Sequence, residues 1–91
     1  MRIDWDPWKS FATYRKRGFA FEQVANVFRG PHFVDRKNDD PDQFFAIGLV
    51  DTTFVTVVFE HREDEIGDYI WIVTYWKSTK YEVNLYAKAT E

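Results

Sequence analysis

The chain has 91 residues, and its 12 Lys and Arg against 15 Asp and Glu give a net charge of −3. A chain this short buries only about 60% of its unfolded surface, so we expect one domain over residues 1–91, which excludes a second lobe or a deep cleft for a large cofactor. The acidic balance also argues against bulk, sequence-blind binding of nucleic acid, which needs a concentrated positive face. We therefore expect no cofactor, and a phosphate-binding site would have to come from a local cluster of cations.

Cysteine is absent, which excludes disulfides and thiolate metal sites and suits a reducing compartment. The longest apolar stretches, 44–50 and 54–59, are far shorter than the roughly 20 residues needed to cross a bilayer. The N-terminal residues show no apolar export segment. These features predict a cytoplasmic protein without a membrane segment.

The first elements in the chain are a strand over 2–5 and a helix over 7–17. Asp6-Pro7 combines a capping side chain with the residue that suits a first helical position, and Gly18 suits the position after the helix end. Residues inside the helix recur at amphipathic spacing, namely Trp8, Phe11, Ala12 and Arg15.

A second short helix is predicted over 21–28, where apolar residues repeat at helical spacing until Gly30-Pro31 ends it. Its start should be weaker than a capped one by about 1 kcal/mol, because Ala20 has no side chain that can cap it. Tertiary packing must therefore stabilise this helix.

From residue 32 the apolar period changes to two, which predicts strands. The expected strands are 32–36, 43–50, 53–62 and 69–77. The breaks between them, 37–42, 51–52 and 63–68, are short enough for hairpins, whereas parallel strands need connections of a dozen residues or more. We therefore predict an antiparallel sheet.

The last element is a helix to about residue 88, which opens with a capping box formed by Thr79 and Glu82. The predicted order is strand, two helices, three or four strands and a final helix. This order is typical of a single α+β domain in which helices pack on a meandering sheet.

Two N-terminal stretches and several later fragments occur in an order that is hard to obtain by chance in so short a chain. The stretches read Trp5-Asp6-Pro7-x-Lys9 and Arg15-Lys16-Arg17-Gly18-Phe19-x-Phe21-Glu22-x-Val24-Ala25-x-Val27-Phe28-x-Gly30-Pro31. The later fragments are an acidic loop over 35–42, Ile47-Gly48, Val57-Val58, the strand 70–77, and Glu82 with Tyr86. Together they make the chain similar to the BrnT family of toxins from bacterial toxin–antitoxin pairs.

This resemblance implies a RelE-like α+β fold, an RNA-cleaving activity that stops translation, and a ribbon-helix-helix antitoxin as partner. The chain departs from the family pattern at several basic positions. The family reads R-I-I-S-A-R-x-A where this chain reads 71–78, so Trp71 and Trp76 stand at both arginine positions. The usual Lys-His-Gly is Lys16-Arg17-Gly18, and an arginine expected before the Ile-Gly strand aligns near Gln43.

The histidines are the side chains whose ordinary pKa lies nearest neutrality, and RNA cleavage needs a base, an acid and cations. His61 lies at a strand end beside Arg62, so we consider an acid–base role for His61 with Arg62 as phosphate clamp. The alternative is a solvated hairpin end, because alternating charges around a turn usually form a polar rim. His32 has no catalytic partner in its neighbourhood and is interpreted as structural.

Other candidate phosphate ligands are cations near helix ends. Lys77 leaves a strand beside the free amides of the final helix, which form a ready anion site, and we count it with Arg62 and His61 as a candidate catalytic residue. Lys37, Lys80 and Arg17 are candidate RNA-binding residues. For the cations at the end of the first helix, a solvated helix end is the alternative, because the helix dipole already favours cations there.

The tryptophans of the last strand are candidate binding residues. Strict alternation places Trp71 and Tyr75 on one face of the sheet and Trp76 on the other, with Ile70 and Ile72. Exposed aromatics can stack RNA bases or anchor a protein partner, and we favour a partner-binding role for Trp71 and Trp76. Packing in the core is the alternative.

The sequence leaves two functions open, and predicts no metal site because no set of His, Cys and carboxylate ligands has suitable spacing. The first is a BrnT-like ribonuclease toxin that acts on RNA and is neutralised by its antitoxin. The second is a catalytically silent BrnT-like module that binds or inhibits another protein.

Overall fold

The computed structural model describes residues 1–91 and begins with strand β1 (Arg2–Trp5) and helix α1 (Pro7–Arg17). The Asp6 carboxylate accepts hydrogen bonds from the Trp8 and Lys9 amides at 2.9 and 3.5 Å. At the other end, Gly18 has φ 99°, a conformation that favours glycine, and its amide donates to the Tyr14 carbonyl. The predicted strand and helix are therefore confirmed, with the caps expected from the sequence.

The predicted helix over 21–28 is only partly α-helical. It consists of one α-helical turn, α2 (Phe21–Val24), followed by the 3₁₀ helix η1 (Ala25–Arg29). As expected, the start lacks a cap from Ala20, and the Gln23 side chain instead accepts a hydrogen bond from the Ala20 amide at 2.9 Å. The tighter winding brings Val27 against Gly48, where a Cβ atom would lie only 3.0 Å from Val27 Cγ1.

The sheet contains five strands in the order β1-β5-β4-β3-β2. The later strands are β2 (His32–Asp39), β3 (Asp42–Val50), β4 (Thr53–Asp64) and β5 (Gly67–Lys77). These four pair antiparallel as predicted, but β1 pairs parallel with β5, so the sheet is mixed and the prediction of a wholly antiparallel sheet is wrong. The reason is that the helices and three strands between β1 and β5 act as one long connection, which permits parallel pairing.

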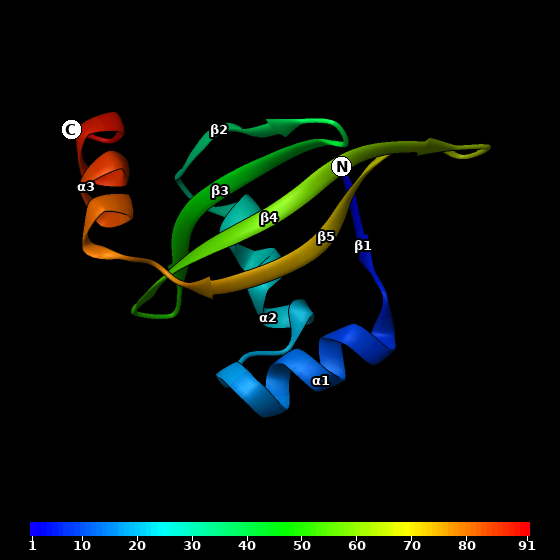
Figure 1. Ribbon diagram of the computed structural model, residues 1–91, viewed down its shortest axis with the longest axis horizontal. Helices are drawn as coiled ribbons and strands as arrows, with labels where there is room; N and C mark the ends of the chain where they lie inside the picture. Colours follow the sequence, from blue (N-terminus) through cyan, green and yellow to red (C-terminus); the bar gives the residue numbers. More distant parts are fainter.

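The strands are longer than predicted because they continue into the expected breaks. Strand β2 runs to Asp39, and Arg36 holds the two arms of this hairpin together by a 2.8 Å ion pair with Asp42. Strand β4 runs to Asp64, and the β4–β5 hairpin projects beyond the rest of the sheet (Figure 1). The charged segments that were predicted to be loops thus continue the paired strands of these hairpins.

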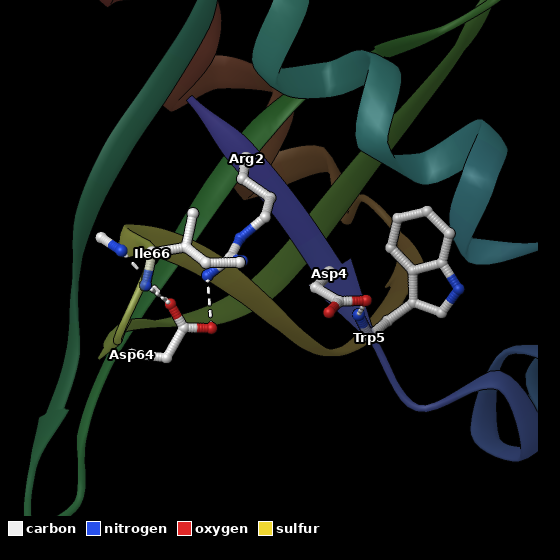
Figure 2. Close-up of polar contacts among 6 residues, drawn as sticks. Arg2, Asp4, Trp5, Asp64 and Ile66 are labelled. Atoms are coloured by element: carbon white, nitrogen blue, oxygen red, sulfur yellow. Dashed lines mark hydrogen bonds and ion pairs between the residues drawn. The ribbon is translucent and has the colours of Figure 1, made fainter.

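Polar contacts join β1 to the tip of this hairpin. Figure 2 shows the Arg2 guanidinium at 2.7 Å from Asp64 Oδ2, while Asp64 Oδ1 accepts a hydrogen bond from the Ile66 amide at 3.0 Å. The hydrogen bond from Arg2 holds the pKa of Asp64 below its ordinary value. The edge strand β1 is therefore connected to the turn between the two longest strands.

The two faces of the sheet have different covers. One face packs against α2 and η1 and forms the core, which includes Phe21, Val24, Val57, Ile72 and Tyr75. The opposite face is covered at the end near β2 and β3 by α3 (Lys80–Ala89), whose Tyr86 ring lies 5.0 Å from the Phe54 ring. Figure 1 shows α3 at one end of the sheet and α1 beyond β5, and no helix lies over the part of this face near β5.

A bulge in β5 changes which residues share a face. Ile72 pairs with Phe59 but Thr74 pairs with Val58, so Val73 is an extra residue in the strand. Tyr75 therefore lies in the core with Ile72, and Trp71 and Trp76 share the opposite face. The prediction that Trp71 and Tyr75 share a face is wrong, because strict alternation does not hold through a bulge.

The capping box of α3 is confirmed and has a second function. Glu82 accepts a hydrogen bond from the Thr79 amide at 2.8 Å, and the same carboxylate accepts from Trp76 Nε1 at 3.1 Å and from the Thr56 hydroxyl at 3.0 Å. Glu82 thus connects α3 to strands β4 and β5.

We predict that Glu82→Ala lowers the free energy of unfolding by about 2 kcal/mol, because it removes hydrogen bonds to a charged group. Thr79→Ala should cost about 1 kcal/mol, since it removes only the cap. Urea unfolding followed by circular dichroism measures both. Glu91→Ala, at the exposed chain end, is the control, and equal midpoints for Glu82→Ala and this control would contradict the role of Glu82.

Candidate functional site

Helix α1 carries Lys9, Lys16 and Arg17 on a side that opens toward strand β5. A hollow of about 310 Å³ lies between them and is lined by Lys9, Ala12, Thr13, Lys16, Arg17 and Thr74. We call it the basic hollow. Lys9 and Lys16 are seven residues apart, two turns of helix, so both point to the same side of α1. No acidic residue occurs within α1, so nothing in this helix neutralises them.

The hollow has a fixed wall because Arg17 anchors α1 to the sheet. The buried Thr13 hydroxyl donates to the Lys9 carbonyl of the same helix at 2.7 Å. The Arg17 guanidinium donates to the Tyr75 carbonyl of β5. Tyr75 lies outside the part of β5 that pairs with β1, which ends at Ile72. Arg17, a predicted RNA ligand, therefore has a structural partner, and Lys9 and Lys16 are the exposed cations of the hollow.

A second group of side chains lies on the helix-free part of the same sheet face. We call Gln43, Glu60, Arg62 and Trp71 the sheet-face cluster. Gln43 Nε2 donates to Glu60 Oε2 at 2.8 Å, and Arg62 donates to Glu60 Oε1 from Nε and Nη2 at 3.0 and 2.8 Å. The Arg62 guanidinium also lies over the Trp71 ring, 4.5 Å from its centroid.

Electrostatics connect the cluster with the basic hollow. The pKa of Glu60 is lowered chiefly by the hydrogen bond from Gln43, then by Arg62 and by the positive charge of Lys9. Lys9 therefore lies within electrostatic range of Glu60. Thr74 and Trp71 point to the same face of β5, on either side of the bulge. Thr74 of the hollow and the residues of the cluster thus lie on one face of the sheet, and Lys9 is the smallest of the causes that lower the pKa of Glu60.

Strand alternation separates the predicted pair of His61 and Arg62. The His61 ring lies 5.0 Å from the Phe44 ring and 5.5 Å from the Phe59 ring, on the core side of the sheet. Arg62 lies on the opposite face with Glu60. A hollow of about 340 Å³ at the strand ends does border both residues, but Glu63 and Asp68 also line it, and their charges repel phosphate.

Lys77 is also far from Arg62. Lys77 pairs with Val55, whereas Arg62 pairs with Tyr69, so they are separated by seven positions of β4, about 23 Å at roughly 3.3 Å per residue. The three candidate catalytic residues therefore do not share a pocket. Lys80 is the exposed first residue of α3 and lies at the end of the sheet with Lys77.

Lys37 and Trp76 come together in another place. A hollow of about 250 Å³ under the start of α3 is lined by Arg36, Lys37, Phe45, Trp76, Tyr81, Glu82 and Leu85. Trp76 is half-buried, and its indole N–H is engaged by Glu82. Trp76 thus supports α3, whereas the half-buried Trp71 belongs to the sheet-face cluster.

Sequence reasoning missed Lys9, Lys16, Glu60 and Thr74 as site residues. The seven-residue spacing of Lys9 and Lys16 was a usable signal, because such residues share a helix side. The position of Glu60 beside Lys9 had no signal in the sequence, since it depends on where α1 packs against the sheet.

Comparison with known proteins identifies the family. The model of the family described as "Ribonuclease toxin, BrnT, of type II toxin-antitoxin system" matches residues 5–82. The chain belongs to the BrnT family. Membership indicates a ribonuclease toxin of a toxin–antitoxin system, with an antitoxin protein as partner. A search of curated protein sequences gave no significant match.

The family match runs from Trp5 through Glu82. The basic hollow and the sheet-face cluster of this BrnT protein both lie within these residues. The match includes Lys9 and Lys16 of the basic hollow, the sheet-face cluster, and both tryptophans. No helix in the structure is long and apolar enough to span a membrane.

We predict that Gln43→Ala and Arg62→Gln each raise the pKa of Glu60 more than Lys9→Ala does. This order follows because the Gln43 hydrogen bond is the largest single cause of the lowered pKa, Arg62 acts through both a hydrogen bond and its charge, and the charge of Lys9 is the smallest cause. Because this pKa is depressed in the folded state, Glu60 stabilises the fold above the unfolded value of about 4.3, and this contribution is lost as the pH falls through the folded pKa. NMR titration of the Glu60 carboxyl measures the order, with Lys88→Ala as control, and an effect of Lys9→Ala larger than that of Gln43→Ala would contradict it.

Proposed function

We propose that this BrnT protein is an RNA-cleaving toxin that stops translation, with its reacting site at the basic hollow and the sheet-face cluster. The observation that supports the proposal is that Thr74 of the basic hollow lies on the same sheet face as Glu60 and Arg62, with Lys9 and Lys16 of α1 lining the hollow, in a chain of a ribonuclease toxin family. We infer a RelE-like arrangement of the fold and a ribbon-helix-helix protein as the neutralising antitoxin, as the family resemblance implies.

The residues present have the chemistry for cleavage through the ribose 2′-hydroxyl. Lys9 and Lys16 bind the phosphate and stabilise the charge that develops on it, since ammonium groups beside a nucleotide act as electrostatic stabilisers. The Glu60 carboxylate, whose pKa is lowered, accepts the proton of the 2′-hydroxyl, and the 2′-oxygen attacks the adjacent phosphorus. The bond from phosphorus to the 5′-oxygen breaks, a 2′,3′-cyclic phosphate forms, and the leaving oxygen takes a proton from water. The hydrogen bonds from Gln43 and Arg62 fix the orientation of this carboxylate.

The loss of an arginine at position 71 is partly compensated from the neighbouring strand. Trp71 pairs with Glu60, and Arg62 places its guanidinium over the Trp71 ring. A cation is therefore present beside position 71, although it comes from β4 rather than β5. An unpaired base stacks on Trp71, worth about 1 to 3 kcal/mol, when it displaces the Arg62 guanidinium from the ring.

A silent binding module is the second candidate, and one observation favours it. The Arg62 guanidinium already donates two hydrogen bonds to Glu60, and Trp76 is engaged by Glu82, so neither replaces a free arginine. In this case the chain keeps the antitoxin-binding surface and lacks RNA cleavage.

We predict that expression of the chain alone arrests growth and degrades RNA. The variant Lys9→Ala/Lys16→Ala should lower the cleavage rate at least 100-fold, because removal of a group that stabilises the transition state costs about 10² to 10³ in rate. Cleavage of a labelled single-stranded RNA by the purified protein measures the effect.

The variants Lys77→Ala and His61→Ala are matched controls, because both residues lie outside the proposed site. They should keep most of the activity. Unchanged RNA with the wild-type chain would support the silent module. Loss of cleavage in Lys77→Ala, with full activity in the Lys9 and Lys16 variant, would move the site to the other end of the sheet.

A further inference from the structure

The aromatic residues of α1 face outward. Trp8 is 81% exposed, Phe11 56% and Tyr14 49%, whereas the polar Ser10 and Thr13 are buried. An amphipathic helix ordinarily turns its apolar stripe toward the core. Since a full aromatic side chain has about 150 to 250 Å² of surface, these three expose roughly 400 Å², a size typical of the largest apolar patch on a monomer, which is often functional.

The patch continues into a hollow of about 390 Å³ between α1 and the segment that leads into α2. Trp5, Pro7, Phe11, Tyr14, Ala20 and Glu22 line it. We call Trp8, Phe11, Tyr14 and this hollow the aromatic face. A ridge of aromatic side chains beside a concavity has the form of a protein interface, in which anchors of a partner enter pockets.

The charges beside the aromatic face select the kind of partner. Helix α1 carries Lys9, Arg15, Lys16 and Arg17 and no acidic residue, although the whole chain has a net charge of −3. Of these cations, Arg15 lies four residues from Phe11 and seven from Trp8, so it shares their side of the helix. Contact between the same faces of two copies would bring two Arg15 guanidinium groups together, which disfavours self-association. A partner with an acidic side chain opposite Arg15 instead gains from this charge.

The backbone N–H and C=O groups of α1 are paired by the helical hydrogen bonds and by the caps. The aromatic face therefore has no free backbone groups with which an added β-strand could pair. A partner helix, whose backbone is equally saturated, fits such a face through its side chains alone. RNA fits it less well, because Glu22 lies in the hollow and Lys9 and Lys16 point to the other side of α1.

We propose that the aromatic face of α1 is the docking site for an acidic amphipathic helix of the antitoxin. The helix places apolar side chains against Phe11, Tyr14 and the hollow, and an acidic side chain against Arg15. This inference rests on the antitoxin partnership that the family implies, and it locates the docking site on the side of α1 away from the basic hollow. Antitoxin binding and RNA cleavage therefore depend on different residues of one helix.

The test measures binding of the protein encoded by the adjoining reading frame to the purified chain, by calorimetry. The double variant Trp8→Ala/Phe11→Ala should weaken binding at least 100-fold while circular dichroism and the urea midpoint stay unchanged, because both side chains are exposed. Arg15→Glu should weaken binding at least tenfold, and Lys88→Glu, an equivalent charge change in the last turn of α3, should leave it unchanged.

Lys9→Ala/Lys16→Ala separates this inference from the proposed function. This variant should keep antitoxin binding and lose cleavage, whereas Trp8→Ala/Phe11→Ala should keep cleavage and lose antitoxin binding. A wild-type chain that binds antitoxin through Trp8 and Phe11 but leaves RNA intact would end the nuclease proposal alone.

Three results would overturn the docking site. The first is unchanged antitoxin affinity in Trp8→Ala/Phe11→Ala, or no binding of the adjoining protein by the wild type. The second is a dimer of the isolated chain in analytical ultracentrifugation that the double variant dissociates, which assigns the face to a second copy. The third is loss of single-stranded RNA binding in this variant with antitoxin binding intact, which assigns the face to RNA.

Discussion

The buried Tyr75 fixes the position of α1 against the sheet. Its hydroxyl donates to the Phe19 carbonyl and accepts from the Phe19 amide, both at 2.8 Å, and its own carbonyl accepts from Arg17. Burial raises the pKa of Tyr75, so the phenol stays neutral and keeps its proton for this hydrogen bond. One residue of β5 thereby satisfies three polar groups around the end of α1. The bulge at Val73 is what turns Tyr75 into the core.

The anchored helix then presents two different sides to solvent. Its buried strip is narrow and polar, with Ser10 donating to Glu22 at 3.2 Å and accepting from the Phe21 amide at 2.9 Å. These polar contacts stabilise the helix position without the aromatic residues, which remain free for a partner. On one side of the strip lie Lys9 and Lys16, and on the other lie Phe11 and Tyr14. The basic hollow and the aromatic face thus lie on different sides of the same helix.

The two tryptophans at family arginine positions have different surroundings. Trp76 donates to Glu82 and so becomes part of the connection between β5 and α3. Trp71 lies under the Arg62 guanidinium on the helix-free face. Trp76 therefore supports the fold, whereas Trp71 lies beside a cation that comes from β4.

The sequence by itself determined the local elements of this protein. Asp6-Pro7, Gly18, and the box of Thr79 and Glu82 act within one turn of chain, so their caps and the bounds of α1 could be predicted, and the alternation of apolar residues located four strands. The candidate site could not be predicted, because it joins Lys9 of a helix with Glu60 of a strand 51 positions later. The parallel pairing of β1, the bulge at Val73 and the outward direction of Trp8 were decided by tertiary structure. Each depends on which residues, far apart in the sequence, form hydrogen bonds and pack together. The spacing of residues within one segment does not determine those long-range contacts.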